Sequence, residues 1–463
     1  MEKVWKMKSR RVVACAVVAI VVSSDAFAGF MHEMPKTTNE KPRDTPYIVK
    51  VVLPDGTRRE VVLDPAGNAS GLKQPNNSDQ TVPLAETGKA IQAAIDAAAA
   101  AGGGIVALES GKTYRSETIR LKSNITLEIP DGAVLVGGEK PDDYDDIDDP
   151  RIDVAPENSR KVFVSCLFAT NVTIRGGGVI DGRGPCFYDT SVKGGHYRKP
   201  PYPRPRMIQF VGCRNVRFEG VTFKDSPGWT CWMRNCEDVA IEGVKVHGDQ
   251  KMINNDGLHI DGCRRVSIRD CDVRTGDDCI VMRAIRGPGG KSLCEDMTVE
   301  DCRLNSSCQC VRLGCPTDGT LRNGVFRRLE MRGVTGILCD LPVRYLHPGE
   351  SGGFDMEDIL FEDCDIAVAG TPLAYRVEPG VMLGRFGNTV FRNMNIRGKG
   401  AITLQGTGDS PIENVTFENV TGTVGADSPL RIESARGIVF KNFTVSGGMG
   451  KKSVKAVGGK CTW

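Results

Sequence analysis

The chain has 463 residues, of which 54 are glycine; 40% of its residues are hydrophobic and 25% are charged. Its formal net charge is +2 at pH 7, and residues 1–28 alone carry a net +3. This is the composition of a globular protein, and the balanced charge of the remainder argues against binding to nucleic acid or to an anionic membrane surface.

Residues 1–28 have the pattern of a signal peptide. A basic start precedes the apolar run VVACAVVAIVV, and Ala26 and Ala28 occupy the small-residue positions of a cleavage site. The run is too short to span a bilayer comfortably. We therefore expect a secreted or periplasmic protein that has no membrane contact after cleavage.

Two local elements are expected before the main domain. Within the polar extension 29–80, IVKVVLPDGTRREVVL predicts a β-hairpin turned at Asp55-Gly56. The segment ETGKAIQAAIDAAAAAGGG predicts one helix that ends at its glycines. We assign residues 81–455 to one large domain and residues 456–463 to a C-terminal tail.

The large domain is built from a repeat. CRNVRFEGVTF, CEDVAIEGVKV, CRRVSIRDCDV and CEDMTVEDCRL follow one another, and NITLEI and NVTIRGGGVIDG are earlier copies. Such a period of β-branched and aromatic residues, broken by Gly, Asn and Asp, is typical of a solenoid. Anchored on Val216, the equivalent positions are Val239, Val266, Met297, Gly324, Ile359, Thr389, Val415 and Ile438.

This repeat predicts an all-β fold, a right-handed parallel β-helix whose strands pair with the coils above and below. The N-terminal helix would cover the open edge of the first coil. Cysteines also recur at fixed offsets from the anchors, three residues before (Cys213, Cys236, Cys263, Cys294) or five after (Cys271, Cys302, Cys364). We expect them to stack in the interior as free thiols, because parallel Cβ vectors disfavour disulfides.

Three aspartates stand out in NNDGLHIDGCRRVSIRDCDVRTGDDC. Asp256 and Asp278 are 22 residues apart, and each lies two residues before a strand start, so they should stack on neighbouring coils about 4.8 Å apart. Asp277 is one residue out of that register and must project differently. A repelling pair that activates water and a third carboxyl that acts as an acid suit glycoside hydrolysis. Ordinary turn chemistry explains each motif equally well when it is taken alone.

The order of the motifs favours the hydrolytic interpretation. GGGVIDGRG, RPRMIQFVGCRNV, DSPGWT, NNDGLHIDGC and TGDDCI resemble, in this order, glycoside hydrolase family 28, the polygalacturonases and rhamnogalacturonases. The resemblance covers roughly residues 81 to 445. It implies single-step inverting hydrolysis without metal or cofactor, with Asp277 as general acid and Asp256 and Asp278 activating water.

The chain departs from the family at two basic segments. Gln309 stands where the family has the histidine of Gly-His-Gly, and Leu338, Cys339 and Asp340 stand where it has Arg-Ile-Lys. In the family those basic residues bind a galacturonate carboxylate. The resemblance therefore implies an acidic or pectin-type polysaccharide or oligosaccharide, with weak action on unsubstituted polygalacturonan.

Further contacts to the sugar are expected from outward positions on the same face. These are His259, Arg283 and Arg312, with Gln309 beside them, since guanidinium groups suit carboxylates or sulfates. Trp229 and Trp232 would either stack on a sugar or pack a loop. Two alternatives stay open: a Ca²⁺-dependent polysaccharide lyase with Arg283 or Arg312 as base, and a non-catalytic carbohydrate-binding β-helix.

Overall fold

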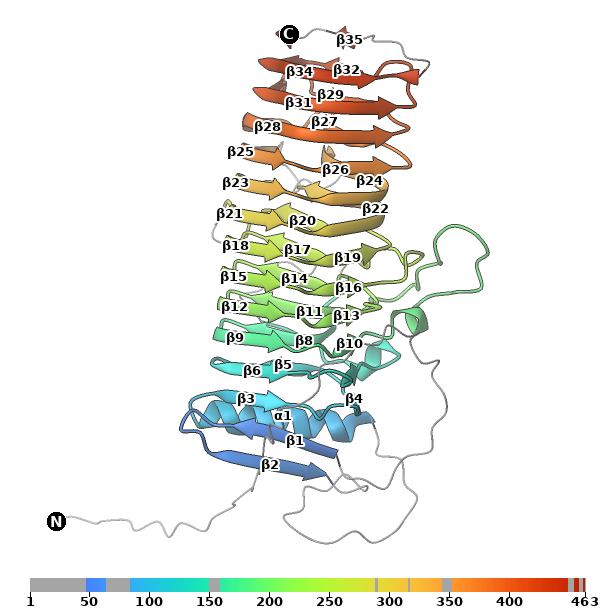
Figure 1. Ribbon diagram of the computed structural model, residues 1–463. Coiled ribbons are helices and arrows are strands. Elements are labelled where there is room, and N and C mark those ends of the chain that lie inside the picture. Colours follow the sequence, from blue (N-terminus) through green and yellow to red (C-terminus); the bar gives the residue numbers. More distant parts are fainter. Residues whose placement is uncertain are drawn as a thin grey trace, which may run out of the picture.

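The computed structural model describes residues 47–63, 84–149, 159–287, 290–314, 317–343, 352–448, 454–457 and 461–462. The expected signal peptide lies outside these residues, as does half of the expected C-terminal tail, residues 458–460 and 463. The described chain winds into a single stack of coils with one helix at its N-terminal end (Figure 1). All the strand pairs between successive coils of the stack are parallel. The predicted parallel β-helix is confirmed.

The stack has three faces, which we name by their role. The anchor face carries the repeat positions of the sequence. Its strands are β3 (Gly104–Ala107), β6 (Ile125–Glu128), β9 (Thr170–Arg175), β12 (Arg214–Glu219), β15 (Glu237–Glu242), β18 (Arg264–Arg269), β21 (Leu293–Glu300), β23 (Thr320–Arg327), β25 (Gly352–Glu362), β28 (Met382–Gly398), β31 (Val415–Val424), β34 (Ile438–Ser446) and β36 (Cys461–Thr462).

The second face follows the anchor face in each coil. Its strands are β4 (Thr113–Arg115), β7 (Val134–Val136), β10 (Val179–Asp181), β13 (Thr222–Lys224), β16 (Lys245–His247), β19 (Asp272–Thr275) and β26 (Asp365–Val368). The site face completes the coil and carries the candidate aspartates at its strand starts. Its strands are β5 (Ile119–Leu121), β8 (Val162–Leu167), β11 (Arg206–Val211), β14 (Cys231–Arg234), β17 (Leu258–Asp261), β20 (Ile280–Arg283), β27 (Leu373–Val377), β29 (Ile402–Gln405), β32 (Leu430–Glu433) and β35 (Val454–Val457).

Two long strands, β22 (Arg303–Leu313) and β24 (Glu330–Leu341), run from the second face into the site face. Their mutual register shifts between Ser306 and Gln309. The coils also contain short elements: β30 (Ile412–Glu413), β33 (Ala435–Arg436) and the 3₁₀ turns η1 (Pro141–Asp143) and η3 (Gly184–Phe187). The register shift falls on the coil that supplies Gln309 and Arg312 to the site.

The register of the anchor face agrees with the sequence prediction at every position. Val216 pairs with Val239, Val239 with Val266, and the alignment continues through Met297, Gly324, Ile359 and Thr389 to Val415. The residue before each anchor has a positive φ, from Asn215 (52°) to Asn414 (51°). Short polar Asn and Asp side chains tolerate this left-handed conformation, which explains their recurrence at that position.

The interior is a set of stacked like residues. Phe326, Phe361, Phe391, Phe417 and Phe440 form a continuous stack, with ring centroids 4.7, 5.3, 5.1 and 5.2 Å apart. Buried cysteines occupy two further columns, one at each offset, and all of these thiols are free: Cys213, Cys236, Cys263 and Cys294 before the anchors, and Cys271, Cys302 and Cys364 after them. The expected thiol ladder is confirmed for these described residues.

The N-terminal elements cover the first coil. The strands β1 (Tyr47–Val52) and β2 (Arg58–Leu63) form an antiparallel hairpin, and β1 also pairs with β3. Helix α1 (Leu84–Ala100) packs its alanine and isoleucine face over the interior of the stack, where Ile91 and Ile95 are fully buried. Helix and hairpin together protect a sheet end that would otherwise expose backbone groups and core.

Candidate functional site

The three aspartates lie at two successive turns that enter the site face. Asp256 precedes β17 and Asp278 precedes β20, and Leu258 pairs with Ile280. The backbone N–H of Gly257 donates to the carbonyl of Asp278 at 2.8 Å. Asp256 and Asp278 therefore occupy equivalent positions on neighbouring coils, as the sequence predicted.

Glycine makes the second turn possible. A Cβ atom on Gly276 would lie 1.8 Å from the carbonyl oxygen of Met252, and the N–H of Gly276 donates to the side chain of Asn255 at 2.8 Å. The turn that carries Asp277 and Asp278 is thus packed directly on the turn that precedes Asp256. This contact brings the three carboxyl groups into one site.

Asp277 and Asp278 have different surroundings although they are adjacent. Asp277 is half-buried, and its two carboxylate oxygens accept the N–H groups of Asn254 and Asp278, each at 3.0 Å. Asp278 is 5% exposed, and its Oδ1 has no hydrogen-bond partner among the described residues. Burial raises the pKa of Asp278, Arg312 opposes the shift and the nearby charge of Asp277 adds to it, and the resulting pKa is about 8. Oxygens of the two carboxyl groups lie within 4.8 Å of each other, so one proton kept on the pair avoids two adjacent negative charges.

Asp256 is held by a buried histidine. The Nε2 atom of His259 lies 2.7 Å from Oδ2 of Asp256, and both side chains are buried. Burial lowers the pKa of His259 well below its usual value, and the charges of Arg283 and Arg312 lower it further. The imidazole is therefore neutral, and because a carboxylate only accepts, Nε2 carries the proton that it donates to Asp256.

A layer of aromatic and charged side chains lies behind Asp256. The indole of Trp229 stacks on His259 with ring centroids 4.0 Å apart, and the guanidinium of Arg283 lies 4.4 Å from the Trp229 ring. Arg283 donates to Asp261 at 3.1 Å, and Arg234 lies 3.2 Å from the same carboxylate oxygen. A buried layer of stacked rings and ion-paired arginines therefore supports the histidine.

These contacts correct two expectations. Arg283 has no exposed surface and His259 is only 2% exposed, so neither side chain faces a substrate as predicted. The alternation of side chains along these strands was predicted correctly. The indole of Trp229, however, stacks on His259 and lies against Arg283, and so covers both side chains. Trp232 is also fully buried and donates its indole N–H to Asp261 at 3.2 Å, which excludes it as a sugar-stacking residue.

Arg312 and Gln309 remain at the edge of the site. Nη1 of Arg312 donates to Oε1 of Gln309 at 3.1 Å and lies 3.7 Å from Oδ2 of Asp278. Nη2 of the same guanidinium lies 3.6 Å from Oδ2 of Asp340. Arg312 thus joins the catalytic candidate Asp278 to Asp340, one of the residues that replace the family's basic segment.

Sequence reasoning missed Cys308, a half-buried thiol. Its sulfur lies within 4.8 Å of carboxylate oxygens of Asp277 and Asp278, the one group of possible metal ligands found in the described chain. Burial raises the pKa of this thiol, and the two carboxylates raise it further. A protonated thiol and two carboxyls suit Ca²⁺ poorly, because that ion takes six to eight oxygen ligands. The cluster is better suited to holding protons, as acid–base cleavage of a glycosidic bond requires.

Comparison with known proteins agrees with this chemistry. Residues 149–288 match the sequence model described as glycosyl hydrolases family 28, and this segment contains all three aspartates. A "Probable polygalacturonase" of Arabidopsis thaliana is 26% identical over 238 residues, 46% of this chain and 50% of that protein. The predicted resemblance to family 28 is confirmed. The chain spans about half the length of that curated relative.

Solved structures show the same fold. The family 28 exopolygalacturonase of Yersinia enterocolitica superposes with a TM-score of 0.64 at 17% identity, over 90% of this chain and 84% of that one. A hyperthermoactive exopolygalacturonase of Thermotoga maritima gives 0.62 at 20% identity, over 77% and 87% of the two chains. At these identities the likeness concerns the architecture. In the part of the chain that the structure describes, no helix has the length and apolar character that a membrane crossing demands.

Proposed function

We propose that the protein is a glycoside hydrolase that cleaves an acidic or pectin-type glycan by single-step inverting hydrolysis. The observation that carries the proposal is the convergence of Asp256, Asp277 and Asp278 at two packed turns within the segment that matches family 28. Their environments differ as acid–base catalysis needs, since burial raises the pKa of Asp278 and the carboxylate of Asp256 is fixed by a neutral histidine.

The proposed mechanism uses the shared proton of the Asp277–Asp278 pair. In the free protein, burial places that proton on Asp278. When it lies on Asp277, the more exposed of the two, Asp277 protonates the leaving glycosidic oxygen and Asp278 becomes a carboxylate facing Arg312. Asp256 and Asp278 then orient and deprotonate the attacking water.

His259 is proposed as a positioning residue in this mechanism. Its Nε2–H fixes one oxygen of Asp256, while stacking on Trp229 fixes the plane of the imidazole. Gln309 and Arg312 are the two predicted substrate contacts that lie at the surface of the site. The neutral amide of Gln309 cannot replace the positive charge of a histidine, which supports our expectation of weak action on unsubstituted polygalacturonan.

The lyase alternative loses one of its candidate bases. Arg283 is buried in an ion pair with Asp261, so it cannot abstract a proton from a bound sugar. Arg312 keeps 12% side-chain exposure, but two carboxylates flank it. A purely carbohydrate-binding role would not require a buried Asp278 with a raised pKa. We also propose export of the protein, on the basis of the pattern of residues 1–28.

The experiment that tests this function is a panel of glycans assayed in parallel for new reducing ends and for ultraviolet absorbance of unsaturated products. We expect saturated products, no loss of activity with a chelator, and a preference for branched or mixed-sugar acidic glycans. Unsaturated products that vanish with the chelator would establish the lyase. An absence of both kinds of product across the panel would leave a binding protein.

A further inference from the structure

A β-bulge determines where Cys308 lies. Between Ser306 and Gln309, β22 contributes two residues where β24 contributes only one. An extra residue of this kind interrupts the ladder of the sheet and re-aims a side chain. Cys308 is one of the two residues, and it is half-buried. Its thiol is therefore separate from the buried columns of cysteines in the interior.

Ser306 fixes this bulge on the turn that carries the two adjacent aspartates. Its hydroxyl donates to the backbone carbonyl of Asp277 at 2.6 Å and accepts the backbone N–H of Cys308 at 2.7 Å. Sγ of Cys308 and one carboxylate oxygen from each of Asp277 and Asp278 lie within 4.8 Å of one another. Local hydrogen bonds thus hold a thiol and two carboxyl groups together.

The buried carboxyl group of this cluster lacks a partner. Asp278 is 5% exposed, and its Oδ1 has no hydrogen-bond partner among the described residues. A buried carboxylate oxygen without a donor is costly, and a bound cation satisfies it. Asp277 accepts two N–H groups. Because an ionised carboxylate has about four acceptor positions, Asp277 also has room for an ion.

The mixture of sulfur and oxygen atoms selects the kind of ion. Ca²⁺ takes oxygen ligands, whereas Zn²⁺ and softer ions bind thiolate together with carboxylate. Ligand atoms on a tetrahedral Zn²⁺ are about 3.3–3.6 Å apart, so the three side chains need to approach one another by about 1.5 Å at most. A thiolate and two carboxylates carry three negative charges. A divalent ion leaves one of them, which faces Arg312.

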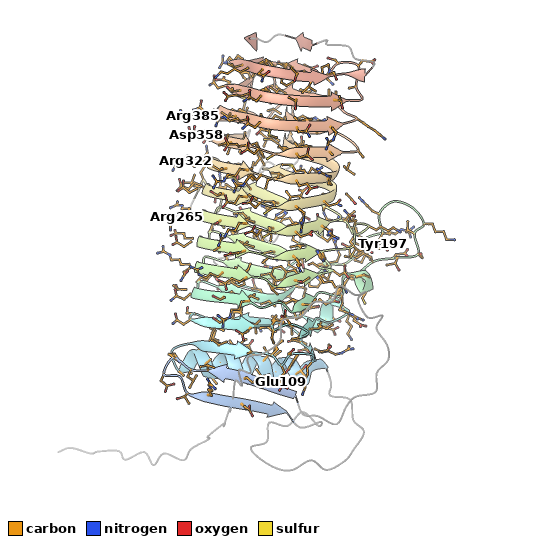
Figure 2. The ribbon with its side chains drawn as sticks, viewed as in Figure 1. Glu109, Tyr197, Arg265, Arg322, Asp358 and Arg385 are labelled. Atoms are coloured by element: carbon orange, nitrogen blue, oxygen red, sulfur yellow. The ribbon has the colours of Figure 1, made fainter. Side chains whose placement is uncertain are left out.

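The cluster lies away from the acidic residues of the anchor face. The backbone N–H of Tyr197 donates at 2.8 Å to the carbonyl of Lys251, in the turn that leads into Asp256, so Tyr197 marks the site's side of the stack. Figure 2 shows Tyr197 and Arg265 of the anchor face on opposite flanks. Carboxylates of the anchor face are paired with arginines, as Asp238 is with Arg265 at 2.6 Å. Ion-paired carboxylates of this kind compete poorly for a cation.

We propose that Cys308, Asp277 and Asp278 form an inhibitory site for a thiophilic divalent cation such as Zn²⁺ or Cd²⁺. The ion displaces the protons that the cluster otherwise holds. Asp277 then has no proton for the leaving oxygen, and Asp278 no longer serves as a base toward water. The inhibition rests on the proposed function, whereas the binding of the ion does not.

The test is a titration with Cd²⁺, followed by the ultraviolet charge-transfer absorbance of the cadmium–thiolate bond. Zn²⁺ affinity is measured by calorimetry, and the effect of Zn²⁺ on glycan cleavage is compared with the metal-free rate of the same protein. We expect the wild type to show the absorbance and to lose activity with Zn²⁺, and a chelator to restore that activity.

Two variants assign the ion to the cluster. Cys308→Ser should lose the absorbance and bind Zn²⁺ roughly 100-fold more weakly, since even the partners of metal ligands contribute about 10–100-fold. Asp278→Asn leaves the thiol in place, so it should keep the absorbance but require more Cd²⁺ to reach it. The matched control is Cys186→Ser, which removes an exposed free thiol in η3 and should bind both ions as the wild type does.

The outcomes separate this inference from the proposed function. An absorbance that persists unchanged in Cys308→Ser would place the ion on another thiol and overturn the inference. A wild-type protein that binds neither ion would also overturn it, as would glycan cleavage that Zn²⁺ leaves unchanged or increases. If Cd²⁺ binds through Cys308 and the metal-free protein cleaves no glycan, then the proposed hydrolase activity fails and the metal site stands.

Discussion

The anchor face and the site face belong to the same coils but bury different kinds of side chain. The anchor face buries aliphatic and aromatic side chains and leaves its charges in exposed pairs such as Arg265 with Asp238. The site face buries Arg234, His259, Asp261 and Arg283. The stack is therefore stabilised by repetition, whereas the site depends on polar residues that the repeat does not contain.

The largest effect is expected from breaking the site itself. Asp277→Asn keeps the size, but its single amide oxygen accepts only one of the two hydrogen bonds from Asn254 and Asp278, and it cannot protonate a leaving group. We expect kcat to fall by roughly 10²–10⁴, while the loss of one backbone hydrogen bond lowers the free energy of unfolding by about 1–3 kcal/mol. Steady-state kinetics and urea unfolding measure the two quantities.

The matched control for this variant is Asp301→Asn, which changes an exposed turn aspartate on the anchor face. It should keep wild-type activity. Near wild-type turnover in a folded Asp277→Asn protein would remove Asp277 from the mechanism.

The same exchange on the two faces should have unequal effects on stability. Asp261→Asn leaves the buried guanidiniums of Arg234 and Arg283 without their carboxylate, so we expect a loss of about 3–5 kcal/mol in the free energy of unfolding. Asp238→Asn breaks an exposed pair with Arg265 and should be indistinguishable from wild type. Equal losses in urea unfolding would contradict the contrast between the faces.

The pH dependence should follow the buried carboxyl pair. The pKa of Asp278 is raised to about 8, so the pair loses its proton, and kcat/KM should fall, as the pH rises above about 8. The same shift affects stability. An aspartate in the unfolded chain has a pKa of about 4, so between about pH 4 and 8 the folded state binds more protons than the unfolded state. The free energy of unfolding therefore declines as the pH rises through that interval.

Asp278→Asn separates these effects. The variant should lose activity. The part of the pH dependence of its unfolding free energy that Asp278 causes should disappear, and at pH 9 the variant should be more stable than the wild type. Unfolding by urea at pH 6 and pH 9 checks this expectation. An unchanged slope in the variant would place the proton elsewhere.

The smallest effect is expected at a turn of the anchor face. Asn323 has a φ of 54°, a conformation that a β-branched residue resists. Asn323→Val should cost about 1–2 kcal/mol of stability, whereas Asn323→Gly should be nearly neutral because glycine accepts this conformation readily. Thermal unfolding of both variants tests the assignment, and equal melting temperatures would show that the left-handed turn does not restrict the sequence.

The anchor face could be predicted from the sequence more completely than the site face. The pairing of Val216 with Val239 and of the later anchors was predictable because each coil repeats its own local turn signals. NNDG and GDD located the aspartates for the same reason. The burial of Arg283 was not predictable, since it depends on Trp229, which lies on another coil.

The proton NMR spectrum of the first sugar released by the wild-type protein tests the central claim most directly. Carboxyl groups on stacked coils about 4.8 Å apart would also suit a retaining enzyme, whose two carboxyls lie about 5–5.5 Å apart. The coil spacing therefore does not distinguish inversion from retention, and the product does. The account predicts a saturated product whose anomeric configuration is opposite to that of the bond cleaved. A product of retained configuration, or one with a conjugated double bond, would contradict it.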